Sequence, residues 1–417
     1  MKNKLLLTNI LLAIFGFSFS ILLSGCLKKS DGEIVKAVPL PFKGQDMVKT
    51  LAGESSLTLF YQAFNRLALA SVITPNTGFT IFAPTDSVLK AVGLDTMGIT
   101  KLPIDSLRKL ITYYIINGAY DDNALTSSII SKQVTTLRQD TVSVFRGNNS
   151  LVIPPLFIKE DEVLYLNGVA VTKSKPAIQT SNGYIYPINS LIAGFPSRTL
   201  YDIIKSDSNL TLYNQSLIIA DSIRDAALSF PDPFSEDVTF FSDPLTYSVS
   251  GNSYVCFYPT VLAPTNKAFN DAGFYTVNDI RQFALRSQTG TDANYTFHSS
   301  PLDSILKHHI LYNYKVAQNN PSTFAGIVRI FYNDLLDPAI NNGVYNSYLG
   351  PYYSLGYATP LSFSAVNGVV NIKWNSDPSS QPVVLPLDAS PQNPVNNFIA
   401  SNGALYKIDK LFYPIVK

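Results

Sequence analysis

The chain contains few of the residues from which metal centres, disulfides and nucleic-acid surfaces are built. Its 417 residues include two cysteines, three histidines and a single tryptophan, and only 15% are charged, with a formal net charge of +1 at pH 7. A near-neutral chain has no basic surface of the kind that binds nucleic acid. The histidines, His298, His308 and His309, are few for a zinc site. We therefore expect no nucleic-acid partner, no bound metal and no other cofactor.

Motifs that carry enzymatic chemistry are also missing. The sequence has no Gly-x-Ser-x-Gly elbow, P-loop, His-Glu-x-x-His or Cys-x-x-Cys, so we predict that the protein is not an enzyme. One acidic group between residues 230 and 251 has the oxygen ligands that calcium prefers, although a solvated loop is the simpler interpretation. This group consists of Asp232, Glu236, Asp237 and Asp243.

The N-terminus has the pattern of a secretion signal. Two lysines precede an apolar run from Leu5 to Leu23, which is typical of a signal peptide rather than a stable membrane span. The tetrapeptide LSGC at 23–26 resembles the lipobox of bacterial lipoproteins. That resemblance implies cleavage before Cys26 and acylation of its thiol and its new amine. A plain membrane anchor with an incidental cysteine is the alternative.

The lipobox also implies a location. We expect residues 1–25 to be a signal peptide and residues 26–42 a tether, with the lipid on Cys26 holding the protein in the cell envelope, in the outer membrane of a Gram-negative bacterium. Loss of residues 1–25 leaves 29 basic against 30 acidic residues. Once Cys26 is acylated, Cys256 has no partner for an intrachain disulfide. We interpret Cys256 as a buried, inert thiol, with a catalytic thiol as the alternative.

One stretch occurs twice, at 78–93 (GFTIFAPTDSVLKAVG) and at 258–273 (YPTVLAPTNKAFNDAG). In each copy a short apolar run predicts a buried strand, and a proline ends the strand because it cannot donate to a ladder. The two residues after the proline have side-chain oxygens that suit the free amides of the helix that follows. These predicted cap residues are Thr85, Asp86, Thr265 and Asn266.

The helix that follows each Ala-Pro-Thr corner, at 83–85 and 263–265, should turn one face to the core, because its apolar residues lie one and four positions apart. The predicted core residues are Val88, Leu89 and Val92 in the first copy and Ala268, Phe269 and Ala272 in the second. Strand, corner and helix therefore form one unit, and two copies predict two domains.

Four further landmarks recur in the same order. They begin at Leu57 and Leu210, at Leu110 and Ile305, at Asn167 and Asn367, and at Ser181 and Ser401. In chain order the five offsets, including that of the corner, rise through 153, 180, 195, 200 and 220 residues. The increases fall in loop-like stretches, so the second copy has gained loop insertions. The Asn-Gly pairs at 167–168 and 367–368 predict tight hairpins.

Together these motifs resemble those of fasciclin (FAS1) domains, and the resemblance covers nearly all of the mature chain. It implies an α+β fold with two tandem FAS1-like domains, each a twisted β-sandwich or wedge with helices packed at one edge. We predict the first domain at 43–196 and the second, with its loop insertions, at 197–417. The family-motif residues expected to be structural are Pro84, Thr85, Asp86, Tyr114, Asn182, Gly183, Pro264, Thr265, Asn266, His309, Asn402, Gly403 and Asp409.

The two copies differ at two ionisable positions. The second copy has His309 and Asp409 where the first has Tyr114 and Asn189. Because both ionisable residues are lost in the same copy, we hypothesise that His309 pairs with Asp409 or with a cap residue of the corner. Tyr114 and Asn189 would then form an uncharged counterpart. A histidine simply packed in the core is the alternative.

The resemblance implies adhesion or ligand binding outside the cell. The segment 345–357 has the composition of an adaptable recognition loop, although packing against the protein itself is the alternative. Its tyrosines are Tyr345, Tyr348, Tyr352, Tyr353 and Tyr357. We predict a lipid-anchored binding or adhesion protein with a protein or glycan partner at the cell surface. A glycan-capturing accessory lipoprotein of a polysaccharide-uptake system is the alternative.

Overall fold

The computed structural model describes the chain from residue 42 to residue 412, with gaps. The described ranges are 42–126, 131–143, 149–160, 163–171, 173, 176–192, 198–227, 248–250, 253–255, 259–287, 290–291, 297–298, 300–311, 313–316, 329–337, 344–348, 359–377, 379–385 and 399–412. All of them belong to one compact unit of the chain, Phe42–Lys417.

Several predicted features lie outside the described residues. They are the signal peptide at 1–25, the tether up to residue 41 with Cys26, Cys256, the acidic group Asp232, Glu236, Asp237 and Asp243, and the tyrosines Tyr352, Tyr353 and Tyr357. These features stay predictions.

The first half of the described chain alternates helices and short strands. Its elements are α2 (Met47–Gly53), α3 (Thr58–Arg66), the 3-10 helix η2 (Leu69–Ser71), β1 (Phe79–Pro84), α4 (Asp86–Ala91), α5 (Thr96–Lys101), α6 (Ile104–Tyr113), β2 (Ile115–Asn117), α7 (Asp122–Thr126), β3 (Lys132–Thr135), β4 (Asp140–Ser143), β5 (Asn149–Val152), β6 (Pro155–Glu160), β7 (Leu164–Leu166), β8 (Val169–Val171), β9 (Ile178–Thr180) and β10 (Gly183–Ile188).

The second half begins with helices and repeats the same kinds of element. They are α8 (Leu200–Ser206), η4 (Ser208–Leu210), α9 (Thr211–Ala227), β11 (Ser248–Ser250), β12 (Ser253–Val255), β13 (Thr260–Pro264), α10 (Asn266–Asp271), α11 (Val277–Ala284), β14 (Gly290–Thr291), β15 (Phe297–His298), α12 (Pro301–Leu306), β16 (Ile310–Leu311), β17 (Asn313–Val316), α13 (Tyr332–Leu336), β18 (Val344–Tyr348), β19 (Thr359–Val366), β20 (Val369–Trp374), β21 (Val383–Leu385), β22 (Ile399–Ala400) and β23 (Gly403–Ile408).

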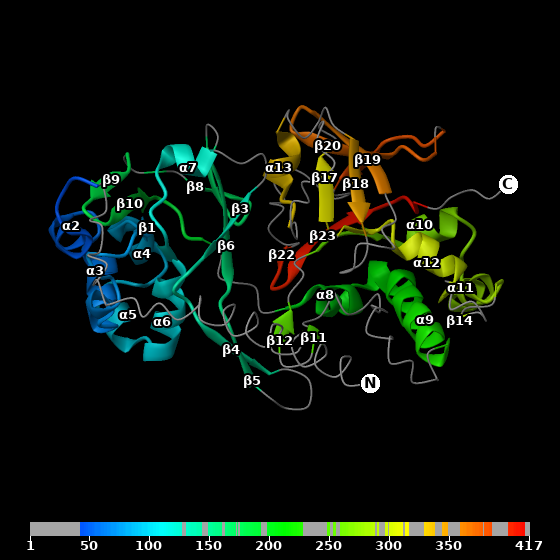
Figure 1. The fold of residues 1–417 in the computed structure, drawn as a ribbon, viewed down its shortest axis with the longest axis horizontal. Helices are drawn as coiled ribbons and strands as arrows, with labels where there is room; N and C mark the ends of the chain where they lie inside the picture. The colour runs from blue at the N-terminus through cyan, green and yellow to red at the C-terminus, as the bar shows by residue number, and fades with distance from the viewer. Residues whose placement is uncertain are drawn as a thin grey trace, which may run out of the picture. The chain divides into compact units, whose positions relative to one another are not determined.

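Each half is organised around a four-stranded sheet of the same topology. The strand orders are β2-β1-β10-β9 and β16-β13-β23-β22. In both sheets the strand before the corner, β1 or β13, pairs in parallel with β10 or β23, the strand of the landmark that begins at Ser181 or Ser401 and closes each copy (the closing motif). Pro84 is opposite Ile188, and Pro264 is opposite Ile408. The corner and the closing motif of each copy, far apart in the sequence, therefore lie side by side, as Figure 1 shows for β1 and β10.

A second, antiparallel sheet accompanies the first in each half. Its strand order is β3-β6-β7-β8 in the first half and β17-β18-β19-β20-β21 in the second. Helices flank the four-stranded sheets (Figure 1). The mixture of helices with separate small sheets confirms the predicted α+β class.

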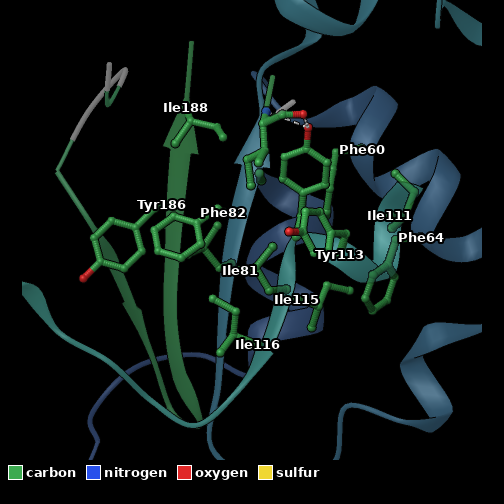
Figure 2. Packing of buried hydrophobic residues seen from close by; sticks show 14 of the residues in the cluster. Phe60, Phe64, Ile81, Phe82, Ile111, Tyr113, Ile115, Ile116, Tyr186 and Ile188 are labelled. Atoms are coloured by element: carbon green, nitrogen blue, oxygen red, sulfur yellow. Dashed lines mark hydrogen bonds between the residues drawn. The ribbon is translucent and has the colours of Figure 1, made fainter. Parts of the chain in front are cut away.

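The first half has one apolar core, which joins α3 and α6 to the four-stranded sheet. Figure 2 shows Phe64 and Ile111 on the helix side of this core and Phe82 beside Tyr186 on the sheet. The rings of Phe82 and Tyr186 stack with centroids 5.1 Å apart. Full burial of side chains such as Phe64 stabilises the fold by about 1.5–3 kcal/mol each.

The second half has two core clusters, on opposite faces of its four-stranded sheet. Along β13, Val261 and Ala263 belong to the cluster with the helices, whereas Leu262 between them belongs to the cluster with the five-stranded sheet. This alternation follows from the two-residue period of a strand. The apolar run that predicted a buried strand is therefore covered on both faces.

The two predicted Asn-Gly hairpins are present. Asn167 and Gly168 have φ values of 52° and 74°, and Asn367 and Gly368 have values of 52° and 76°. These left-handed conformations fit a tight two-residue hairpin. They connect β7 to β8 and β19 to β20, with each pair of flanking residues in register.

Candidate functional site

The corner of each copy is tied to its closing motif through a threonine hydroxyl. The hydroxyl of Thr85 donates to Oδ1 of Asn189 at 3.1 Å, and that of Thr265 donates to Oδ1 of Asp409. The Asn/Asp difference between the copies therefore falls on one and the same contact. Both an amide and a carboxylate oxygen accept this bond.

Asp86 and Asn266 cap a helix other than the predicted one. Oδ1 of Asp86 accepts the backbone N–H of Leu59 at 2.8 Å, at the start of α3. Oδ1 of Asn266 accepts the N–H of Leu212 at 2.9 Å, at the start of α9. The prediction that these residues cap α4 and α10 is wrong, because each is the first residue of its own helix and turns its side chain to the neighbouring one. Thr265 does cap α10, through the N–H of Ala268.

Thr85 makes no side-chain capping bond in α4, so that part of the prediction is also wrong. The corner helices are shorter than predicted and end before Val92 and Ala272. Val92 is 51% exposed, and Ala272 is exposed as well. Neither is a core residue, whereas Leu89 and Phe269 are buried as predicted.

His309 does not pair with Asp409. Its Nδ1 lies 2.9 Å from the carbonyl oxygen of Leu262, and its Nε2 accepts the backbone N–H of Phe412 at 3.0 Å. Donation from one ring nitrogen and acceptance at the other require a neutral imidazole. Complete burial lowers the pKa of His309 to about 3. The hypothesis of a His309–Asp409 pair is wrong, because both ring nitrogens have backbone partners and Asp409 is bonded to Thr265.

Tyr114 occupies the equivalent position in the first half. Its hydroxyl accepts the backbone N–H of Ile192 at 3.0 Å, and Phe412 follows Ile192 by the 220 residues that separate the closing motifs. The predicted Tyr114–Asn189 counterpart is also absent, since Asn189 accepts from Thr85. A tyrosine oxygen and an unprotonated imidazole nitrogen thus supply the same acceptor.

His308 lies against Trp374, with ring centroids 5.3 Å apart. Its Nδ1 contacts the carbonyl oxygen of Ser304, and burial lowers the pKa of His308 to about 4. His298 belongs to β15. In the described ranges, no group of three or more His, Cys, Asp or Glu side chains is arranged to hold a metal ion.

The Asn-Gly pair that recurs at the start of each closing strand, at 182–183 and 402–403, has a packing role. Oδ1 of Asn182 accepts the N–H of Met47 at 3.0 Å, and Oδ1 of Asn402 accepts that of Leu200 at 2.8 Å. Each asparagine therefore fixes the start of the first helix of its half.

Gly183 and Gly403 allow close approach of the corner strand. A Cβ atom would lie 1.8 Å from the carbonyl oxygen of Phe79 at Gly183 and 2.4 Å from that of Pro259 at Gly403. Only glycine fits such positions. Like the prolines that end β1 and β13, these residues serve the packing of the sheet.

The tyrosine-rich segment is described only in part. Tyr345 and Tyr348 lie in β18, where Tyr345 is opposite Val316 and Leu361 and Tyr348 is opposite Asn313. The strand is an interior strand of its sheet, between β17 and β19. Binding by these tyrosines stays a prediction.

A group of polar contacts between the two halves, centred on α13, was not predicted from the sequence. Oδ1 of Asp334 accepts the backbone N–H and the hydroxyl of Ser131 at 2.9 and 2.8 Å, while Oδ2 accepts the N–H of Phe331 at 2.9 Å. Asp334 is completely buried. Burial, opposed by these hydrogen bonds, raises the pKa of Asp334 to about 6.

Aromatic and cationic side chains extend this contact. The ring of Phe331 meets that of Phe157 edge-on, with centroids 5.4 Å apart. The guanidinium of Arg329 lies 4.8 Å from the centroid of Phe157, within the range of a cation–π interaction. Nη2 of Arg329 also donates to the carbonyl oxygens of Ala400 and Ser401 at 2.9 and 3.2 Å.

An ion pair completes the group. Nζ of Lys159, on β6, lies 2.6 Å from Oδ2 of Asp337, and the Lys159 side chain is fully buried. Two basic and two acidic side chains thus meet where β6 and the start of β3 face α13. The sequence signal was the presence of charged residues within the apolar stretch RIFYNDLLD at 329–337, since buried charges occur where they are paired.

The described part of the chain contains no helix that is both long and apolar enough to cross a membrane. A family model for the Fasciclin domain matches residues 55–193, inside the first predicted domain. The comparison with curated proteins found no match.

Among solved structures, the chain is similar to a FAS1 domain pair from the insect cell adhesion molecule fasciclin I. The identity is 13%, the TM-score is 0.29, and the match covers 87% of this chain and 97% of that chain. Because the TM-score is low, the assignment of the fold rests on the family match and on the strand order that both halves share.

Proposed function

Residues 55–193 are a fasciclin domain, and on this premise we propose that the chain is a binding or adhesion protein built from two such domains. Fasciclin domains are non-catalytic domains of the adhesion type. The observation that carries the proposal is the family match. The second half supports it because its central sheet has the same order and its corner makes the same contact with its closing motif.

We propose further that a lipid on Cys26 anchors the protein in the outer membrane of a Gram-negative bacterium, with both domains outside the cytoplasm. The support is the sequence of residues 1–26, in which two lysines are followed by an apolar run and then by the tetrapeptide LSGC. Metabolic labelling with a radioactive fatty acid should label the wild-type protein and leave Cys26→Ser unlabelled. Cys256→Ser is the matched control and should keep the label. A labelled Cys26→Ser variant would contradict the anchor.

The proposed partner is a protein or a glycan of the cell surface. The acylated protein, used as bait for a solubilised native envelope, should retain a partner in a saturable manner. Capture of an envelope protein supports adhesion through protein contacts. Glycan binding that is lost in Tyr352→Ala/Tyr353→Ala would instead favour the accessory of a polysaccharide-uptake system. Retention of neither class would contradict the binding function.

A further inference from the structure

Helix α13 is the second domain's counterpart of α7 in the first domain. The hydroxyl oxygen of Thr80 accepts the N–H of Tyr120 at 2.9 Å, just before α7. That of Thr260 accepts the N–H of Ile330 at 2.8 Å, just before α13. Both helices have five residues and begin two residues after these bonds. A second pair of bonds agrees, because a closing-strand tyrosine donates to the carbonyl of Tyr120 in one domain and of Ile330 in the other.

The two helices differ at the positions that start them. In α7, Oδ1 of Asp121 accepts the N–H of Ala124 at 2.8 Å, which is an ordinary N-cap within one domain. In α13 these positions hold Phe331 and Asp334, 210 residues further along the chain. The capping role is reversed, since Asp334 now reaches back to the N–H of Phe331.

Because of this difference in capping, the side chains of Phe331 and Asp334 can both contact the first domain. Phe331 no longer caps, and its ring rests on Phe157 and on the Asn-Gly hairpin, where a Cβ added to Gly168 would lie 2.5 Å from the ring. Asp334 keeps one oxygen for its own helix and gives the other to Ser131. The changes at the two positions therefore act together.

Burial of charged side chains makes the contact between α13 and the first domain favour one relative arrangement of the two domains. Arg329, Asp334 and Lys159 are at most 1% exposed. Buried charges are tolerated only where they are paired and hydrogen-bonded, so any sliding or rotation of the domains would leave one of them uncompensated. Apolar contacts alone would not impose this penalty.

We propose that α13, with its flanks Arg329 and Asp337, is an interdomain latch that makes the two fasciclin domains one cooperative body. The helix that is internal to the first domain, α7, corresponds in the second domain to a helix, α13, that docks on the first domain. Force or ligand binding on one domain is then transmitted to the other through β6 and the 167–168 hairpin. This inference concerns the chain's internal mechanics and does not depend on the identity of its partner.

Carbodiimide cross-linking tests the arrangement in the unmodified chain from residue 27 onward. The reagent activates a carboxylate, and attack by an adjacent amine forms an amide with loss of the activating group. Peptide mass spectrometry should find Lys159 joined to Asp337 in protein of monomer mass, in a yield independent of protein concentration. The exposed pair Lys267–Asp271 within α10 is the positive control. A missing Lys159–Asp337 link, or its presence only in dimers, would overturn the proposal.

Hydrogen exchange tests the coupling. In Asp334→Ala, amides of α13 and also of β6 and the start of β3 should exchange roughly tenfold faster or more. The reason is that the substitution removes a buried charge that is hydrogen-bonded to both domains. Asp121→Ala is the matched control at the cap of α7 and should accelerate exchange in the first domain alone. Acceleration in Asp334→Ala that is confined to the second domain would overturn the latch.

Discussion

The backbone N–H of Phe412 donates to Nε2 of His309 at 3.0 Å. The imidazole accepts this bond only while Nε2 is unprotonated. Burial lowers the pKa of His309 from 6.5 to about 3. Between these values the unfolded chain binds a proton that the folded chain does not. The contribution of His309 to stability is therefore complete above about pH 6.5 and is lost progressively as the pH falls toward 3.

His309→Tyr should remove this pH dependence, because Tyr114 supplies the same acceptor in the first domain. Lowering the pH from 7.5 to 5 should cost the wild type about 2 kcal/mol more than it costs the variant. Urea unfolding at both pH values, followed by fluorescence of the single tryptophan, Trp374, measures this difference. The titrations of His308 and Asp334 are common to both proteins and cancel in the comparison. Equal pH dependence in the two proteins would disprove a neutral His309.

Tyr213 lies in the core of the second domain at the position that Phe60 occupies in the first. Both are completely buried, and no hydrogen-bond partner for the Tyr213 hydroxyl lies among the described residues. Tyr213→Phe should therefore be neutral or stabilise the protein by about 1 kcal/mol. Tyr406→Phe is the matched control, since its hydroxyl donates to the carbonyl oxygen of Ile330 at 2.8 Å, and it should destabilise by about 1 kcal/mol. Thermal unfolding distinguishes the two, and a destabilised Tyr213→Phe would show that its hydroxyl is satisfied.

The sequence was sufficient to predict the parts of the fold that repeat. The corner, the Asn-Gly hairpin and the closing motif each depend on local conformation or on close backbone approach, as at Gly183. Such requirements restrict the residue type and therefore leave a visible motif. The partners of side chains were harder to predict. Asp86 is of a residue type that commonly caps its own helix, but the amide that it caps, that of Leu59, lies 27 residues away in the sequence.

The latch could not be predicted because its two sides lie in different domains. Ser131 and Asp334 are 203 residues apart. Neither residue belongs to a repeated motif. The sequence spacing between equivalent positions of the two domains gives no information about contacts between the domains. The match between α7 and α13 is also hidden in the sequence, since Asp121 is replaced by Phe331 and Ala124 by Asp334. The bonds that Thr80 and Thr260 accept, together with those that Tyr186 and Tyr406 donate, reveal it.

The capping of α3 by Asp86 can be tested with two substitutions at one position. Asp86→Asn should keep most of the stability, because Asn266 makes the same contact with α9 in the second domain. Asp86→Ala removes the acceptor of the Leu59 amide and should cost about 1 kcal/mol. Urea unfolding compares the three proteins. Equal losses for both substitutions would mean that the carboxylate charge, rather than the oxygen acceptor, stabilises the helix.

The contact between Phe331 and the first-domain hairpin can be isolated with two matched glycines. Gly168 and Gly368 have φ values of 74° and 76°, so substitution by alanine should cost each about 1 kcal/mol through the backbone. A Cβ at Gly168 would lie 2.5 Å from the Phe331 ring, whereas one at Gly368 meets nothing within 4 Å.

Gly168→Ala should therefore lose about 1–3 kcal/mol more than Gly368→Ala in urea unfolding, because the ring and the hairpin must move apart. In a Phe331→Ala background the ring is absent, and the two glycine substitutions should then cost the same. Equal losses in the wild-type background would mean that Phe331 does not rest on this hairpin. An excess loss that persists without the ring would place its cause within the first domain instead of at the latch.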